Sequence, residues 1–245
     1  MSRARRVALV TGGSRGIGRA VVEALVDRGV DVAFTYQSSA DEARALSESL
    51  QSSGGVRVVA VKHDLSTGDA YQLVRTVVHE LGHFDSLILN AGTWKGGLID
   101  RLDPDAWWSV VQTNVQGNYA VARAATDVLA ESSGSVLFVS SAVGISGFVG
   151  DTAYATSKAA LTGLARSLAR EWGPRGVRAN VVAPGFVETD MTAAVSDSAR
   201  ARVSERIILG RFGTAEEIAR TICFLSEDAT YITGTVLAVD GGWSI

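Results

Sequence analysis

Short, mostly apolar runs recur along the chain, and segments with helical spacing of apolar residues separate them. Apolar runs without strict alternation are typical of strands buried on both faces of a parallel sheet. The runs lie at 7–10, 31–36, 56–61, 86–89, 136–139, 177–182 and 234–239. Because such strands alternate with helices, the sequence predicts an α/β fold, a Rossmann-type doubly wound seven-stranded parallel sheet with helices on both faces.

The intervening segments differ in the strength of their helical pattern. Helical spacing is clear after the first glycine-rich turn up to residue 28, and at 40–52, 67–81, 104–115, 152–172 and 216–225. The segment 186–213 has a weaker pattern and fewer core positions, so we expect a mobile substrate lid there. No repeat, linker or change of composition divides the 245 residues, which predicts a single domain over 1–245.

Composition and charge narrow the classes of partner. The net charge is −3, so nothing favours a nucleic-acid partner. Cys223 is the only cysteine, which predicts no disulfide framework and no metal site built on cysteine and histidine. No run reaches 18 apolar residues and no apolar signal core follows Met1, so we expect a soluble cytoplasmic protein without a membrane partner. We expect Arg3, Arg5 and Arg6 to form a solvated tail.

The first apolar run leads into a glycine-rich turn and then into a helix. The turn reads Thr11-Gly12-Gly13-Ser14-Arg15-Gly16-Ile17-Gly18. Glycine lets the backbone approach an anion closely, and the free N–H groups at a helix start carry partial positive charge. The spacing is G-x-x-x-G-x-G rather than G-x-G-x-x-G, and no Gly-Lys-Ser/Thr of a Walker loop follows. Strand, glycine turn and helix in this order predict a nucleotide site.

The end of the second apolar run bears on the choice of dinucleotide. It reads Tyr36-Gln37-Ser38-Ser39 and has no carboxylate, the group that typically holds a free ribose 2′-OH at this place. Arg15 in the glycine turn can instead meet a 2′-phosphate, so the sequence favours NADP(H) over NAD(H). The alternative is that Arg15 is only a solvated loop residue.

Tyr154 and Lys158 are spaced for chemistry if the segment from about Thr152 is helical. Residues four apart share one helix face, so the ammonium can lie beside the phenol and favour the phenolate. Ser141, at the end of the run 136–139, can hydrogen-bond the same substrate oxygen that the tyrosine protonates. The alternative for a Tyr-x-x-x-Lys pair is an ordinary surface pair on a helix.

Small and polar residues follow several predicted strands. Because the carboxyl ends of parallel strands meet at one edge, where ligands of such sheets bind, these residues should lie together. They are Gly12, Tyr36, Asp64, Asn90, Ser141 and Pro184. Asn114 lies within the apolar helical segment 104–115, where a buried amide can simply satisfy neighbouring backbone.

Taken together, these motifs resemble the short-chain dehydrogenase/reductase family along essentially the whole chain. The resemblance implies a catalytic tetrad of Asn114, Ser141, Tyr154 and Lys158, in which Tyr154 is the general acid in reduction. It also implies that Lys158 lowers the pKa of the tyrosine and holds the ribose hydroxyls, and that Asn114 holds a water of the proton relay. The nicotinamide supplies the hydride.

The cofactor-binding set that follows from the glycine turn and the resemblance covers most strand ends. Asp64 is expected at the adenine, Asn90 to Gly92 along the adenosine side, and Val187 and Thr189 near the carboxamide and pyrophosphate. The full set is Gly12, Ser14, Arg15, Gly16, Ile17, Gly18, Ser38, Asp64, Leu65, Asn90, Ala91, Gly92, Tyr154, Lys158, Pro184, Gly185, Val187 and Thr189.

Within the family, the segments 180–191 and 209–213 are most similar to 3-oxoacyl-[acyl-carrier-protein] reductases. That similarity implies NADPH-dependent reduction of a 3-oxoacyl thioester, as in fatty acid biosynthesis, by a homotetramer. The segment 130–133 lacks the basic residues that suit an acidic carrier protein, and Arg175 and Arg178 remain as possible docking cations. Phe148 and Asp151 also depart from the small or amide residues usual before the catalytic tyrosine.

Two other functions stay open. One is reduction of a different ketone, such as a polyketide or another secondary-metabolite intermediate, or oxidation of an alcohol. The other is a nucleotide-binding regulatory protein that has kept the fold and lost turnover. The small residues after Thr152 and the apolar C-terminal residues favour oligomerisation, although either can pack inside one subunit.

Overall fold

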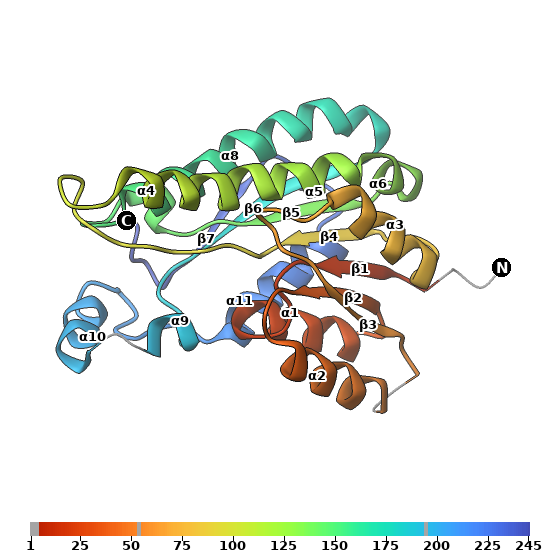
Figure 1. Ribbon diagram of the computed structural model, residues 1–245, viewed down its shortest axis with the longest axis horizontal. Coiled ribbons are helices and arrows are strands. Elements are labelled where there is room, and N and C mark those ends of the chain that lie inside the picture. Colours follow the sequence, from red (N-terminus) through yellow and green to blue (C-terminus); the bar gives the residue numbers. More distant parts are fainter. Residues whose placement is uncertain (1–4, 53–54, 194–195) are drawn as a thin grey trace.

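The computed structural model describes residues 5–52, 55–193 and 196–245. In this part of the chain, seven parallel strands form one sheet with the order β3-β2-β1-β4-β5-β6-β7 (Figure 1). The strands are β1 (Val7–Val10), β2 (Asp31–Tyr36), β3 (Val58–Lys62), β4 (Ser86–Leu89), β5 (Ser135–Val139), β6 (Arg178–Pro184) and β7 (Val236–Val239). The predicted fold class is confirmed.

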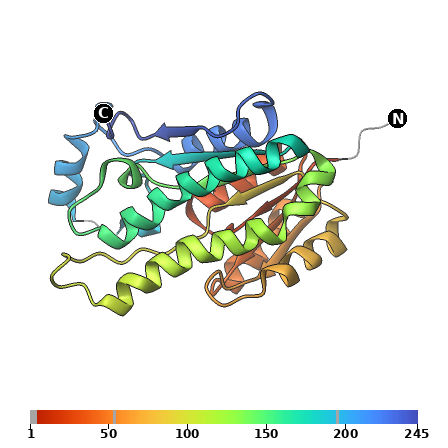
Figure 2. The same ribbon diagram turned by 90° about the horizontal axis from the view of Figure 1, so that it is seen from above.

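Helices cover both faces of the sheet, as Figure 2 shows from above. The α-helices are α1 (Gly16–Asp27), α2 (Ala40–Ser52), α3 (Ala70–Leu81), α4 (Pro104–Val111), α5 (Asn118–Ala124), α6 (Thr126–Ser132), α7 (Val143–Ser146), α8 (Thr152–Trp172), α9 (Asp190–Ala193), α10 (Asp197–Ser204) and α11 (Ala215–Cys223). Two π-helices, Gln112–Gly117 and Phe224–Asp228, and the 3₁₀ turn Gly173–Arg175 complete the described elements.

The alternating side chains of β1 build two separate cores. Ala8 and Val10 pack with residues of α1, α2 and α11 on one face, whereas Val7 and Leu9 pack with α3, α5 and α8 on the other. Fully burying a side chain of this kind contributes about 1.5–3 kcal/mol, so both faces hold the sheet rigidly. The loops at its carboxyl edge are thus attached to a fixed frame.

The helical segment predicted at 104–115 is a regular α-helix, α4, only as far as Val111. After α4 the chain makes one wide π-turn, Gln112–Gly117, before α5 resumes. Gly117 explains the tight packing there, since a Cβ on it would lie 2.3 Å from the carbonyl oxygen of Leu65 in the loop after β3. Such π-turns often occur at functional sites, and this one contains Asn114.

The N-terminal arginines do not form the solvated tail that was expected. Arg6 donates to Glu227, whose carboxylate is buried, over 2.8 Å, and Arg5 lies 3.3 Å from the buried Asp31. Arg3 lies outside the described residues. These contacts tie the start of the chain to the amino edge of the sheet.

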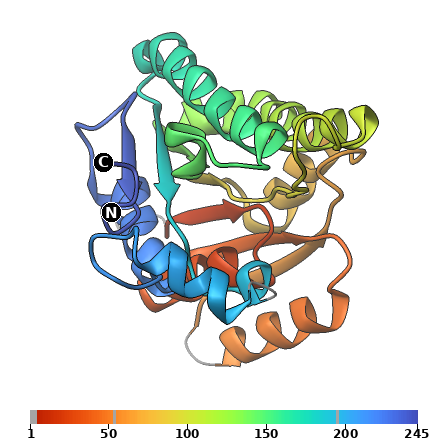
Figure 3. The same cartoon turned by 90° about the vertical axis from the view of Figure 1, so that its left-hand side faces the viewer.

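The expected lid segment stands off the carboxyl edge of the sheet, in front in Figure 3. It contains α9 and α10, and a bridge between Val187 and Gly213 joins its two ends. Phe186, the first residue of this segment, packs with Phe148 and Trp243, and the ring centroids of the three are 5.5 to 5.9 Å apart. No helix within the described ranges is both long and apolar enough to cross a membrane.

Candidate active site

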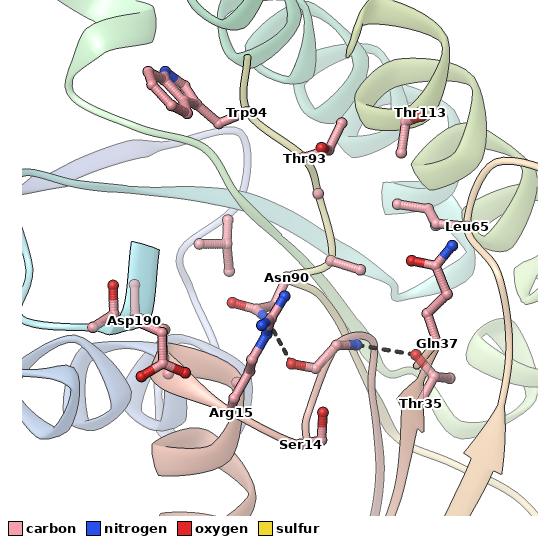
Figure 4. Close-up of a pocket in the computed structure, with 18 of the residues that line it drawn as sticks. Ser14, Arg15, Thr35, Gln37, Leu65, Asn90, Thr93, Trp94, Thr113 and Asp190 are labelled. Atoms are coloured by element: carbon pink, nitrogen blue, oxygen red, sulfur yellow. Dashed lines mark hydrogen bonds between the residues drawn. The ribbon is translucent and has the colours of Figure 1, made fainter. Parts of the chain in front are cut away.

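A cleft of about 660 Å³ opens at the carboxyl ends of the strands. It lies where β1 and β4 are neighbours, the point at which the order of the strands reverses and ligands of such sheets bind. Every residue of the predicted cofactor set lines it, as do Ser141, Tyr154 and Lys158. Figure 4 shows Trp94 at one end of the cleft, well away from Ser14 and Gln37. Asn114 alone among the predicted residues lies behind the wall, fully buried.

The glycine turn has the shape that an anion site requires. Gly12 and Gly16 take φ angles of 67° and 54°, where other residues are strained. A Cβ on Gly18 would lie 2.1 Å from the carbonyl oxygen of Gly12, so only glycine lets α1 start this close to the turn. No side chain caps the N-terminus of α1 and no acidic residue lies in its first turn. Its N–H groups therefore remain available to a phosphate, so the turn fits a dinucleotide.

Asn90 holds the glycine turn in place rather than only lining the cleft. Its side-chain amide donates to the carbonyl oxygens of Thr11 and Gly12, both over 3.1 Å. The hydroxyl of Thr11 in turn accepts from the backbone N–H groups of Asn90 and Ala91, both over 3.0 Å. These bonds lock the ends of β1 and β4 together beneath the cleft.

Asp64 presents a firmly ionised carboxylate on the adenosine side. Hydrogen bonds from the hydroxyl and backbone N–H of Ser66, with another from Gln37 over 2.8 Å, lower the pKa of Asp64 to about 2. A carboxylate held in this way accepts further donors readily. Gln37 was not among the predicted residues, although its place directly after β2 was a usable signal.

Arg15 is exposed and has no ion pair within the described part of the chain. It lines the cleft together with Ser38, and the stretch after β2 supplies no carboxylate up to Ser39. An unpaired guanidinium beside hydroxyl groups is suited to a phosphate monoester.

Tyr154 and Lys158 lie together in α8, which starts and ends where the sequence predicts. The Lys158 ammonium lies 5.6 Å from the centroid of the Tyr154 ring and donates to the carbonyl of Val139 over 2.8 Å. Burial lowers the pKa of Lys158 to about 8. Burial also raises the pKa of Tyr154 to about 12, against a hydrogen bond with Ser141 that lowers it. The shift of the tyrosine is thus opposite to the expected one, because burial disfavours charge on both groups.

Asn114 fixes the wall of the cleft with its side chain. Its carbonyl oxygen accepts from the N–H of Thr93 over 2.7 Å, and its amide donates to the Thr93 carbonyl over 2.8 Å and to the Ser157 hydroxyl over 3.0 Å. Both amide hydrogens are therefore used within the protein. The side chain joins the loop after β4 to α8, while the predicted water-holding role remains a prediction.

Further residues line the cleft that the sequence analysis did not nominate. Trp94 and Thr93 belong to the loop after β4, and Asp190 begins α9 in the expected lid. Their signal was weak because neither loop follows an apolar or helical pattern. Gln37, His63 and Thr113 line it as well.

The two expected docking cations lie at the wrong edge of the sheet. Arg178 is the first residue of β6, whose last residue, Pro184, reaches the cleft, and its guanidinium donates to the carbonyls of Leu225 and Ser226. Arg175 pairs with Asp127 over 2.9 Å. Both are engaged in the subunit itself, so they are not free cations beside the cleft.

A glycine turn that faces a Ser, Tyr and Lys cluster across one cleft defines the class of Rossmann-fold nucleotide-dependent oxidoreductases. The family model described as "Enoyl-(Acyl carrier protein) reductase" matches residues 12–244. The chain belongs to the short-chain dehydrogenase/reductase family.

Its relatives in sequence include reductases of known name. The chain is 40% identical over 239 residues to 3-oxoacyl-[acyl-carrier-protein] reductase FabG of Escherichia coli K12, covering 97% of this chain and 96% of that one. It is 39% identical over 238 residues to the FabG of Staphylococcus epidermidis, covering 96% and 97% of the two chains.

Solved structures also resemble it. One is a blue fluorescent protein from a metagenomic library in complex with NADPH, with 36% identity, a TM-score of 0.92 and 98% of both chains covered. Another is a short-chain dehydrogenase from Burkholderia cenocepacia in complex with NADP, with 35% identity and the same TM-score and coverage.

Proposed function

We propose that the protein reduces the ketone of a 3-oxoacyl thioester to the 3-hydroxyacyl product with NADPH. The observation that carries this proposal is the Tyr154 phenol, hydrogen-bonded with Ser141, in the same cleft as the glycine turn. The FabG relatives support the substrate class. The relatives with NADPH or NADP bound agree with the cofactor prediction.

The chain's own residues account for cofactor binding. The N–H groups at the start of α1 would hold the pyrophosphate, Arg15 and Ser38 the 2′-phosphate, and Asp64 the adenine. When bound, NADPH supplies the hydride to the carbonyl carbon. Lys158, fixed by the Val139 carbonyl, would hold the ribose hydroxyls.

Tyr154 would donate the proton that the reduced carbonyl oxygen requires. Its raised pKa keeps the phenol protonated at neutral pH, which is the form that a general acid must have. Ser141 would direct the substrate oxygen toward that phenol by donating a second hydrogen bond.

Turnover with wild type and Tyr154→Phe tests this proposal. We expect NADPH consumption with a short 3-oxoacyl thioester, a loss of about 10³ in kcat/KM for Tyr154→Phe, and much weaker use of NADH. Tyr71→Phe is the matched control, because Tyr71 is exposed on α3 and does not line the cleft. Unchanged turnover in Tyr154→Phe would remove the reason for placing catalysis here.

A second candidate is a reductase of a ketone that no carrier protein delivers. The engagement of Arg175 and Arg178 within the subunit favours it, and so do two departures from the carrier-protein reductases: Asp151, which bonds the cleft-lining Trp94, and Phe148, which packs in one cluster with Tyr154. A panel of free ketones, polyketide-type thioesters and acyl carriers separates the two. If NADPH binds tightly and no ketone is turned over, the result favours a nucleotide-binding regulatory protein over an enzyme.

Assembly, location and lid motion complete the proposal. We infer a homotetramer, since Ala159, Ala160 and Gly163 of α8 are exposed, and so are the large side chains of Trp108 and Tyr119. Light scattering at micromolar concentration tests this, and a monomer mass would contradict it. The segment 186–213 serves as a lid on the single domain, and the protein works in the cytoplasm.

A further inference from the structure

A carboxylate lies three residues before Tyr154 and is hydrogen-bonded to Trp94, which lines the cleft. Asp151 is the N-cap residue of α8, yet its side chain makes no capping bond to the helix, although aspartate usually does so at this position. Its Oδ1 accepts instead from the indole Nε1 of Trp94 over 2.8 Å. The charge is therefore turned away from the helix start and toward the loop that lines the cleft.

Two loops are joined at this point. The N–H of Gly97 donates to the carbonyl of Gly150 over 2.7 Å, directly beside the Trp94–Asp151 bond. Figure 2 shows the segment before α4 and the segment before α8 side by side at the left. Gly96 makes the pairing possible, because a Cβ on it would lie 2.7 Å from the Trp94 ring. Trp94 itself lines the cleft.

The carboxylate keeps acceptor capacity to spare. Trp94 is the one hydrogen-bond donor to its oxygens in the described part of the chain, whereas an ionised carboxylate accepts several. Asp151 is half-buried, and burial raises its pKa. The charge of Asp151 also raises the pKa of Tyr154, so its field reaches the reacting end of the cleft.

We propose that Asp151, oriented by Trp94, is a specificity-determining residue that acts through its charge. It favours ketones with a hydrogen-bond donor or a cation beside the carbonyl group, and it disfavours ketones with a carboxylate or phosphate there. The proposal rests on the proposed ketone reduction and names the substrate class more narrowly. A neutral 3-oxo thioester or amide fits this cleft, and a free 3-oxo acid does not.

A matched series of ketones tests the charge. The series is a 3-oxo ester, the corresponding 3-oxo amide with an N–H donor, and the 3-oxo carboxylate, each reduced by wild type and Asp151→Asn with NADPH. Asparagine keeps an acceptor for Trp94 and removes the charge, while its NH₂ group adds a donor. We expect kcat/KM for the carboxylate to rise about tenfold, chiefly through KM, and that for the ester to change less than about threefold. An equal change for all three ketones would overturn the proposal.

Trp107→Phe is the matched control. Its indole also donates to the start of α8, to the Thr152 hydroxyl over 3.2 Å, but Trp107 does not line the cleft. We expect this variant to leave the ranking of the three ketones unchanged, whereas Trp94→Phe, which frees the carboxylate, alters it. If Trp107→Phe altered the ranking as much as Asp151→Asn, the effect would be structural and the proposal would fail.

A binding measurement separates this proposal from the proposed function. The three 3-hydroxy analogues are titrated into the NADPH complex, which holds no hydride acceptor for an alcohol, with tryptophan fluorescence as the readout and no turnover required. A ranking that changes in Asp151→Asn supports the charge proposal even if no ketone is reduced. Turnover without any change of ranking supports the proposed function and refutes the role of Asp151.

Discussion

Buried charged groups have counterions at the amino edge of the sheet, but the buried ammonium at its carboxyl edge has none. At the amino edge, the buried Glu227 accepts from Arg6 over 2.8 Å and from the Ser86 hydroxyl over 3.2 Å, and the buried Asp31 is paired with Arg57 over 2.8 Å. At the carboxyl edge, the buried Lys158 ammonium has the Val139 carbonyl as its one hydrogen-bond partner among the described residues, and no carboxylate pairs with it there.

The difference separates structural from chemical use of the same kinds of side chain. A buried charged group that is hydrogen-bonded to a group of opposite charge stays ionised. Removing one member of such a pair destabilises the protein, because the other charge is left buried without a partner. A buried ionisable group without a counterion shifts its pKa toward the neutral form, which suits proton transfer near neutral pH. Matched charges, which have a counterion, therefore stabilise the amino edge of this sheet. Unmatched charges, which have none, belong to the candidate active site at its carboxyl edge.

The largest expected effect comes from removing the unmatched charge of Lys158. The pKa of Lys158 is about 8 in the folded protein against a usual 10.5, so between these values the unfolded chain holds a proton that the folded one has lost. Rising pH therefore stabilises the wild type in this window. Between pH 7 and pH 11, we expect the free energy of unfolding of the wild type to rise by about 3 kcal/mol relative to that of Lys158→Met.

Urea unfolding at several pH values measures this gain. Lys62→Met is the matched control, because Lys62 is exposed at the end of β3. A stability difference between wild type and Lys158→Met that does not vary with pH would mean that Lys158 is not desolvated. Activity should be lost in Lys158→Met at every pH.

A second prediction concerns the pair of Glu227 and Arg6 at the amino edge. Glu227→Gln leaves Arg6 without its counterion, and we expect the free energy of unfolding to fall by about 2 kcal/mol, less than for a fully buried pair because Arg6 is partly exposed. Arg28→Gln, which removes the exposed pair with Asp228, should cost less than about 0.5 kcal/mol. Thermal unfolding measures the loss of stability in each variant, and kcat shows whether the active site is affected. A loss of kcat in folded Glu227→Gln would show that the two edges are not independent.

The smallest effect concerns the unmatched Arg15. If its guanidinium meets a 2′-phosphate, Arg15→Ala should raise the KM for NADPH about tenfold and leave that for NADH nearly unchanged. Arg19→Ala is the control, because Arg19 pairs with Glu23 on the exposed face of the same helix. Equal losses with both cofactors would assign Arg15 to the pyrophosphate instead.

The sheet and most of the cleft could be predicted from sequence because they depend on local pattern. The buried strand β1 is a continuous apolar run, β2 and β4 are mostly apolar, and α8 lies between Thr152 and Trp172 as its pattern indicates. The parallel arrangement then brings the ends of these strands to one edge without further information. The lining residues were predictable for that reason.

Features that depend on contacts between distant segments could not be predicted. The π-turn around Asn114 follows from the packing of Gly117 against Leu65, and no helical pattern encodes it. The sign of the Tyr154 shift depends on burial rather than on its spacing from Lys158. Arg178 looked like a free cation because its partners, the carbonyls of Leu225 and Ser226, lie more than forty residues away.

The strand order also dictates how the chain can be assembled during translation. β1, made first, ends in the middle of the sheet with β2 on one side and β4 on the other. The side of β1 that meets β4 stays unpaired until the ribosome has made Ser86 to Leu89, and the sheet then grows outward, strand by strand, to β7. A nascent chain stalled before residue 86 exposes an apolar strand edge, so this stage is the one at which a chaperone has most to protect.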